Sequence, residues 1–141
     1  MGTRCLTVIK DDDGSEIAVM YRHWDGGLAS HGKELVKFLK PMRLIDGISD
    51  DNEKNVANGM NDLAAQVICH FKKKKGHRVG KIYLYTPETR DVGEEFIYEV
   101  YYCDGKINLK IFREWDKAVL YNDDVKKLSL SELTKLEKSA K

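Results

Sequence analysis

Residues 4–22 read RCLTVIKDDDGSEIAVMYR, and this stretch decides the expected fold. Its two outer runs are rich in strand-forming residues, and the turn sequence Asp13-Gly14 lies between them. Two such runs around a short polar turn predict a β-hairpin. Because side chains alternate along a strand, each strand has two faces. The residues expected to share a face are Cys5, Thr7 and Ile9 on the first strand, and Ile17, Val19 and Tyr21 on the second.

Two amphipathic helices are expected after the hairpin. The first has Ser30 as its predicted N-cap and ends before Pro41. The second is capped by Asn55 or Asn58 at its start and by Gly76 at its end. Apolar residues at helical spacing give each helix a buried stripe. The stripe residues are Leu35, Phe38 and Leu39 in the first helix, and Val56, Met60, Leu63, Ala64, Ala65, Val67, Ile68 and Phe71 in the second.

The rest of the chain is mostly β. Ser129 and Glu132 form a capping box for a C-terminal helix. We therefore expect an α+β fold, in which a mostly antiparallel sheet carries two main helices on one face in the order ββααβββ(β)α. Residues 1–128 would form a single domain, followed by a short C-terminal helix or tail over 129–141. The segments expected to be strands are 81–87, 96–103, 106–112 and a short one over 117–122, and the polar segment 46–55 is expected to be a surface loop.

Composition limits the classes of partner. The chain has 141 residues, of which 42% are hydrophobic and 33% charged, and a net charge of +1. This balance supports one core but gives no general attraction to nucleic acid or anionic membranes. Neither a membrane span nor a signal-peptide core is visible in the sequence, so we expect a cytoplasmic protein. The odd set Cys5, Cys69 and Cys103, without a CxxC pair, predicts reduced core cysteines.

The candidate functional site is YRHWDGGLASHG, residues 21–32, between the hairpin and the first helix. Its glycines can bare backbone amides, and these amides with the start of the helix would form an anion-binding concavity. Arg22 would add a bidentate donor for phosphate, and Trp24 a surface on which a base could stack. A plain strand-to-helix turn explains the same residues. The expected ligand-binding residues are Arg4, Tyr21, Arg22, Trp24, Asp25, Gly26, His31 and Gly32.

Metal-assisted hydrolysis is an alternative use of this stretch. His23, Asp25 and His31 could hold a metal with Cys69 or His70, or act as base and orienting group. No motif of known mechanics supports that alternative. The basic segment 69–78, CHFKKKKGHR, fits phosphate contact or, more simply, a solvated helix end. We therefore expect no cofactor, no metal and no catalytic residue, and nucleic acid is a poor candidate partner.

Four stretches carry a resemblance: MGTRCLTVIKDDDGSEIAVMYRHWDGG, SHGKELVKFL, NGMNDLAAQVICHFK and GEEFIYEVYY. Together they resemble a family of small uncharacterised proteins found mostly in phages, prophages and some bacteria. Members open Met-Gly-Thr-Arg-Ser-Leu-Thr and carry Tyr-Arg-Gln-(Phe/Trp)-Asp-Gly-Tyr-Pro, and the resemblance spans residues 1–115. Cys5 stands where the family has serine, His23 where glutamine is common, and Gly27-Leu28 where Tyr-Pro is usual. A glutamine at that position argues against an essential base at His23.

The resemblance carries no activity, but it implies a phage-encoded accessory protein in the host cytoplasm. We expect a non-enzymatic protein that binds a small anionic ligand, such as a nucleotide or second messenger, to counter host defence. The alternatives are a protein–protein inhibitor of a host factor and a metal-assisted nucleotide hydrolase. An aromatic sheet face also favours a homo-oligomer, and its residues are Tyr83, Tyr85, Tyr98, Tyr101 and Tyr102.

Overall fold

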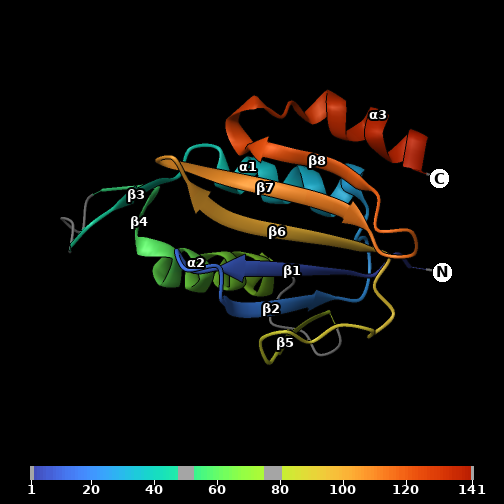
Figure 1. Ribbon diagram of the computed structural model, residues 1–141, viewed down its shortest axis with the longest axis horizontal. Helices are drawn as coiled ribbons and strands as arrows, with labels where there is room; N and C mark the ends of the chain where they lie inside the picture. Colours follow the sequence, from blue (N-terminus) through green and yellow to red (C-terminus); the bar gives the residue numbers. More distant parts are fainter. Residues whose placement is uncertain (1, 48–52, 75–80, 141) are drawn as a thin grey trace.

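The computed structural model describes residues 2–47, 53–74 and 81–140 of the chain. Its main feature is a six-stranded sheet with the strand order β5-β2-β1-β6-β7-β8 (Figure 1). β1 pairs antiparallel with β2 and parallel with β6, and the remaining pairings of this sheet are antiparallel. The strands are β1 (Cys5–Lys10), β2 (Glu16–Arg22), β5 (Ile82–Tyr85), β6 (Phe96–Cys103), β7 (Lys106–Arg113) and β8 (Val119–Asp124).

The helices pack on one face of the sheet (Figure 1). A π-helical turn, η1 (Leu28–Gly32), leads directly into α1 (Lys33–Leu39). α2 (Gly59–Lys74) contacts β1 and β2, and α3 (Leu130–Ala140) packs against η1 and α1. The shorter elements are the parallel strands β3 (Arg43–Ile45) and β4 (Val56–Asn58) and the 3-10 turn η2 (Val125–Lys127).

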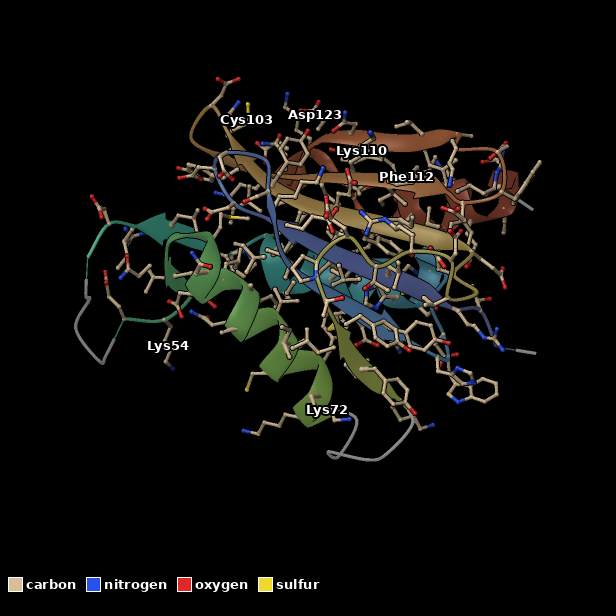
Figure 2. All side chains as sticks on the ribbon, turned by 60° about the horizontal axis from the view of Figure 1, so that its bottom comes forward. Lys54, Lys72, Cys103, Lys110, Phe112 and Asp123 are labelled. Carbon is tan, nitrogen blue, oxygen red and sulfur yellow. The ribbon has the colours of Figure 1, made fainter. Side chains whose placement is uncertain are left out.

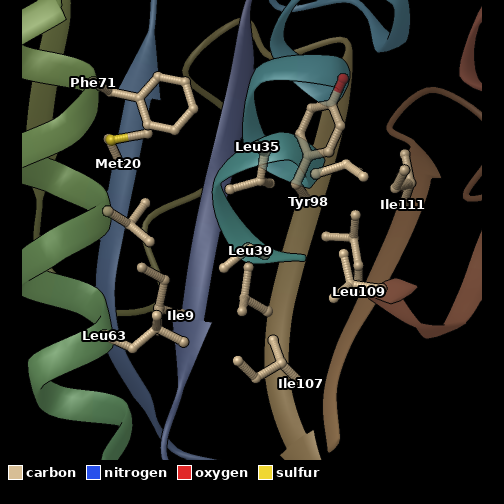
Figure 3. Close-up of a cluster of buried hydrophobic side chains, with 14 of the residues drawn as sticks. Ile9, Met20, Leu35, Leu39, Leu63, Phe71, Tyr98, Ile107, Leu109 and Ile111 are labelled. Atoms are coloured by element: carbon tan, nitrogen blue, oxygen red, sulfur yellow. The ribbon is translucent and has the colours of Figure 1, made fainter. Parts of the chain in front are cut away.

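The main hydrophobic core lies between the helices and the sheet, as Figure 3 shows. α1 and α2 each present most of the stripe that their sequence spacing predicts, and the inward side chains of β1, β2, β6 and β7 meet it. Burying one such aliphatic side chain stabilises the fold by about 1.5–3 kcal/mol. The buried side chains in this view include Leu35, Leu39, Leu63, Phe71, Ile9, Met20, Tyr98, Ile107, Leu109 and Ile111.

The opposite face of the sheet carries a smaller apolar cluster. Residues 86–95, here named the crossing loop, connect edge strand β5 to the more central β6 and therefore pass over this face. Val92 of the crossing loop packs on the cluster. The buried Glu94 carboxylate accepts the amides of Asp91 and Val92, at 3.0 and 2.8 Å, which satisfies two backbone donors of the loop. The cluster consists of Leu6, Val8, Val19, Tyr21 and Ile97.

The Glu16 carboxylate ties the crossing loop to β2. Arg90 donates from Nη1 to Oε1 at 3.2 Å and from Nη2 to Oε2 at 2.6 Å, and the amide of Glu88 donates to Oε1 at 2.7 Å. Desolvation raises the pKa of Glu16, but the hydrogen bonds from Arg90 and Glu88 and the charges of Arg90 and Lys10 outweigh it. The pKa of Glu16 therefore lies below its ordinary value of 4.5.

We expect this tie to weaken in acid. A carboxyl with a lower pKa in the folded than in the unfolded protein stabilises the fold above its unfolded pKa, and this stabilisation is lost as pH falls through the folded pKa. The free energy of unfolding should decrease as pH falls below 4.5. Glu16→Gln should remove part of this pH dependence and lower the free energy of unfolding at neutral pH by about 1–2 kcal/mol.

Urea denaturation at several pH values checks this prediction. Glu53→Gln is the matched control, because the Glu53–Arg43 ion pair, at 2.9 Å, is exposed. Equal pH dependence in the Glu16→Gln variant and the unchanged protein would contradict it.

The predicted α+β class, the hairpin and the mostly antiparallel sheet are confirmed. The capping box is also confirmed, since the Ser129 hydroxyl accepts the amide of Glu132 at 3.2 Å and donates to its carboxylate at 3.0 Å. α3 packs on the same core as α1 and α2, with Leu133 fully buried. Among the described residues, none of the helices combines the length and apolar character that a membrane crossing requires.

Several local predictions are wrong. A bulge shifts the pairing after Ile9, so Ile17 packs on the main core while Val19 and Tyr21 face the crossing loop. The predicted stripe of the second helix is too long at its start and too wide, because Val56 belongs to β4 and Ala65 is exposed. The surface loop predicted over 46–55 is different: its described residues are exposed and lie between β3 and β4, as predicted.

The cysteine prediction holds only for Cys5. Burial raises the pKa of the Cys5 thiol far above its usual range, against the lowering effect of Arg22, so this thiol stays protonated as a small apolar group. Cys69 and Cys103 are free and exposed, not part of the core.

The predicted N-caps of α2 are not found. Asn55 and Asn58 do not cap α2 with their side chains as predicted: Asp62 accepts the amide of Asn58 instead, at 2.8 Å. The predicted C-cap Gly76 lies outside the described residues.

Candidate functional site

The predicted phosphate donor, Arg22, is buried inside the protein. Arg22 pairs with Cys5 across the hairpin, so its side chain points toward the helices, and it is 1% exposed. Its Nε donates to the carbonyl of Trp24 at 2.7 Å, and its Nη2 lies 3.4 Å from Oε1 of Glu34. The guanidinium also lies 5.9 Å from the ring centre of Phe71. Internal partners therefore occupy the group that was expected to bind a ligand.

His31 completes this buried network. Nη1 of Arg22 lies 3.1 Å from Nδ1 of His31, and Nε2 of His31 lies 2.7 Å from Oγ1 of Thr7. A guanidinium can only donate, so Nδ1 must accept. The proton of the ring is then on Nε2 and is donated to Thr7, and the imidazole is neutral. His31 is fully buried and packs against Phe71, with ring centres 4.7 Å apart and ring planes tilted by 31°.

The backbone amides of the turn are also used internally. The amide of Gly26 donates to Thr3 at 2.8 Å, that of His31 to Asp25 at 3.1 Å and that of Gly32 to Gly27 at 3.1 Å. Tyr98, from β6, donates its hydroxyl to the carbonyl of Gly26 at 2.8 Å. The expected anion-binding concavity at the start of α1 does not form, because the amides of Ser30, His31 and Gly32 donate to nearby carbonyls.

Six of the eight predicted binding residues thus differ from the expectation. Arg22, His31, Gly26 and Gly32 are buried with internal partners, and Gly32 packs against Tyr98 and Leu133. Tyr21 is 5% exposed and its hydroxyl lies 2.8 Å from Nδ1 of His23, so its ring is not free for stacking. Asp25 is exposed, but it does not line the pocket described below.

The predicted N-cap, Ser30, has another role. It donates its hydroxyl to the carbonyls of Asp25 and Gly27.

Arg4 and Trp24, the two remaining predicted residues, do line one pocket. This cavity of about 250 Å³, here named the outer pocket, opens at the end of the sheet where β2 ends and β6 begins. Among the described residues, Arg4 forms no ion pair, and its side chain is exposed. Trp24 is 44% exposed. The residues that line the outer pocket are Gly2, Arg4, His23, Trp24, Gly93 and Glu95.

Two glycines allow the side chains of the outer pocket to sit where they do. A Cβ at Gly2 would lie 2.0 Å from the ring of Trp24, so only glycine lets the indole rest on this backbone. Gly93 has a φ of +90°, and a Cβ there would lie 2.7 Å from Nη1 of Arg4. Both the flat ring and the guanidinium are therefore held against bare backbone.

An aromatic row continues from the outer pocket onto the sheet. His23 meets Trp24 edge to face with centres 4.8 Å apart, and Tyr21 lies 5.9 and 5.7 Å from the rings of Tyr83 and Tyr85. Tyr83 is 42% exposed at edge strand β5. The row therefore fixes the positions of His23 and Trp24, while Trp24 keeps 44% of its surface exposed.

The metal alternative lacks a suitable geometry. His31 is enclosed by Thr7 and Arg22, whereas His23 contacts Tyr21 on the other face of the sheet. Over residues 2–47, 53–74 and 81–140, no group of three or more His, Cys, Asp or Glu side chains lies close enough to hold a metal ion. Of the basic segment, Lys72 donates to the carbonyl of Ile82 at 2.9 Å, and residues 75–78 lie outside the described part of the chain.

No family model, curated protein or solved structure matches this chain, so the site is interpreted from its own geometry. The resemblance to the phage family remains a prediction. Sequence reasoning missed Gly93 and Glu95, because the parallel β1–β6 pairing, not chain proximity, brings residues 93–95 to the pocket. It also missed Gly2, although Gly2 lies two residues before Arg4. A local signal existed for Arg22: alternation places it on the same strand face as Met20, which is apolar and faces the core.

Proposed function

We propose that this protein binds a small anionic ligand with a flat ring, of the nucleotide class, in the outer pocket. The single observation that supports this proposal is that one cavity is lined both by the exposed Arg4 guanidinium, which forms no ion pair with the described residues, and by the half-exposed indole of Trp24. Guanidinium groups bind phosphate through two parallel hydrogen bonds, and indole rings stack on bases.

The other lining groups suit such a ligand. The Glu95 carboxylate is exposed and could accept hydrogen bonds from an exocyclic amino group of a base. A volume of about 250 Å³ accommodates only part of a nucleotide, so the remainder would lie against the neighbouring surface. The ligand would therefore be held by one charge contact and one stacking contact, without covalent chemistry.

Calorimetric titration with linear and cyclic nucleotides tests this proposal. We expect at least one nucleotide to bind with a stoichiometry of one, and Arg4→Ala and Trp24→Ala each to weaken its affinity at least tenfold. Stacking on one aromatic side chain contributes about 1–3 kcal/mol per base, which supports that magnitude for Trp24.

The control is Lys54→Ala. Lys54 is exposed and does not line the outer pocket. This variant should bind as the unchanged protein does. Folded protein that binds none of the nucleotides, or pocket variants that bind as well as the control, would overturn the proposal.

The resemblance to a phage family extends the proposal to a biological role. A phage-encoded protein that sequesters a nucleotide second messenger in the host cytoplasm would weaken a host defence that depends on this signal. Binding without turnover is the activity that such a role requires.

Inhibition of a host protein is the second candidate function. Trp115 and Val119, at the β7–β8 turn, are 77% and 54% exposed. This turn adjoins the outer pocket, because the amide of Glu114 donates to the carbonyl of Glu95 at 2.9 Å. Native mass spectrometry of protein purified from its host separates the two functions. A co-purified nucleotide supports the first, and a stoichiometric protein partner without a small ligand supports the second.

A further inference from the structure

A second cavity lies at the opposite end of the sheet from the outer pocket. It has a volume of about 330 Å³ and is here named the hairpin-end pocket, because the β6–β7 turn forms one wall. The end of α1, strand β3 and the turn η2 form the other walls. The outer pocket is at the start of β6 and the hairpin-end pocket at its end, so the full length of this strand separates them.

The inner part of the hairpin-end pocket is apolar. Leu39, Met42, Ile107 and Val125 line it, and each belongs to the main core with no more than 6% exposure. Leu44 and Tyr102, both half-buried, extend this lining toward solvent. These side chains are held by the core, so the apolar surface is already formed without a ligand.

The rim of the hairpin-end pocket is cationic. Arg43, Lys106 and Lys126 line it, against one carboxylate, that of Asp124. Arg43 is paired with Glu53 at 2.9 Å, whereas Lys106 and Lys126 form no ion pair within the described part of the chain. Asp124 already accepts the backbone amide of Lys126 at 3.0 Å as the cap of η2. Two ammonium groups therefore remain for an external anion.

We propose that the hairpin-end pocket binds an amphipathic anion: a carboxylate with an unbranched apolar chain of medium length. The chain would lie on the apolar lining, and the carboxylate would be placed between Lys106 and Lys126. An apolar cavity of about 300 Å³ or more with a few convergent polar groups is typical of small-molecule sites. A free phosphate would use the lysines but leave the apolar lining unoccupied, and it therefore fits less well.

Calorimetric titration of the full chain with decanoate, butanoate and inorganic phosphate tests this inference. We expect decanoate to bind with a stoichiometry of one and at least tenfold more tightly than butanoate or phosphate. Lys106→Glu combined with Lys126→Glu should weaken decanoate binding at least tenfold.

The matched control combines Lys110→Glu with Lys127→Glu, which changes the net charge equally. Figure 2 shows Lys110 beside Phe112 on β7, on the sheet face away from α2, and Lys127 pairs with Asp123. Neither lysine lines the hairpin-end pocket, so this control should keep the affinity for decanoate. Circular dichroism confirms that each variant is folded.

Three results would overturn the inference. The first is no binding of decanoate, and the second is an affinity for decanoate no higher than that for butanoate or phosphate. The third is an equal loss of decanoate affinity in the control and in the pocket variant. Arg4→Ala and Trp24→Ala separate this inference from the proposed function. They should weaken nucleotide binding in the outer pocket at least tenfold while decanoate binding stays unchanged, so either site can fail without the other.

Discussion

Arg22→Ala should lower the free energy of unfolding by about 3–5 kcal/mol, the usual loss when one partner of a buried charge network is removed. Three groups would lose the donor that they share: the carbonyl of Trp24, Nδ1 of His31 and the carboxylate of Glu34. The substitution would also leave a cavity beside Phe71 and Cys5, because the arginine side chain fills buried space there. Urea denaturation followed by circular dichroism measures the change.

Two comparisons make the Arg22 prediction specific. Arg43→Ala removes an arginine from an exposed ion pair and should cost about 0–1 kcal/mol. Arg22→Lys keeps the charge but replaces the three guanidinium nitrogens with one ammonium nitrogen, which cannot reach three separate acceptors. This variant should therefore also be strongly destabilised. If Arg22→Ala does not fold, the Lys variant and Arg22→Met carry the comparison. A loss no larger than that of Arg43→Ala would show that the network does not stabilise the fold.

Phe71→Ala should also lower the free energy of unfolding by about 3–5 kcal/mol, the range for a fully buried phenylalanine. Phe71 is the residue through which α2 covers the network: its ring packs against His31 and lies under the guanidinium of Arg22. Removing the ring would admit water to polar groups that are now shielded by it. Phe71→Leu, which keeps much of the volume, should cost clearly less.

Cys69→Ala is the matched control on α2, because Cys69 is exposed and its truncation should change the free energy of unfolding by less than about 0.5 kcal/mol. The double variant Arg22→Ala, Phe71→Ala tests the contact between the two residues. We expect its loss to be smaller than the two single losses added, since residues in contact are rarely additive. Full additivity would mean that Phe71 stabilises only the apolar core.

Sequence reasoning succeeded where neighbouring residues determine the structure. The hairpin over residues 4–22, the stripe that includes Leu63 and Phe71, and the capping box at Ser129 all depend on spacings of a few residues. It failed where a distant segment decides the outcome. Short strands β3 and β4 exist because they pair with each other, and neither has a periodic pattern long enough to read.

The same distinction between neighbouring and distant residues applies to the candidate site. Arg4 and Trp24 were predicted from their chemistry, but the turn that was expected to hold the ligand is closed by contacts with Thr3, Tyr98 and α3. Gly26 was predicted to bare its amide to a ligand, but this amide donates to Thr3, and the glycine instead gives room to the backbone of Arg4 and Cys5. The amino-acid type shows that a side chain can bind phosphate, whereas only the fold shows whether that side chain faces solvent.

The parallel pairing of β1 with β6 has a consequence for biosynthesis. A ribosome makes residues 5–10 long before it makes residues 96–103, the partner that lies beside them in the finished sheet. One side of β1 therefore stays open during most of translation, with Leu6 and Val8 facing water. Such a strand readily pairs with strands of other nascent chains. We expect the growing polypeptide to need chaperones until the second half has emerged, and expression at lower temperature to raise the yield of native protein.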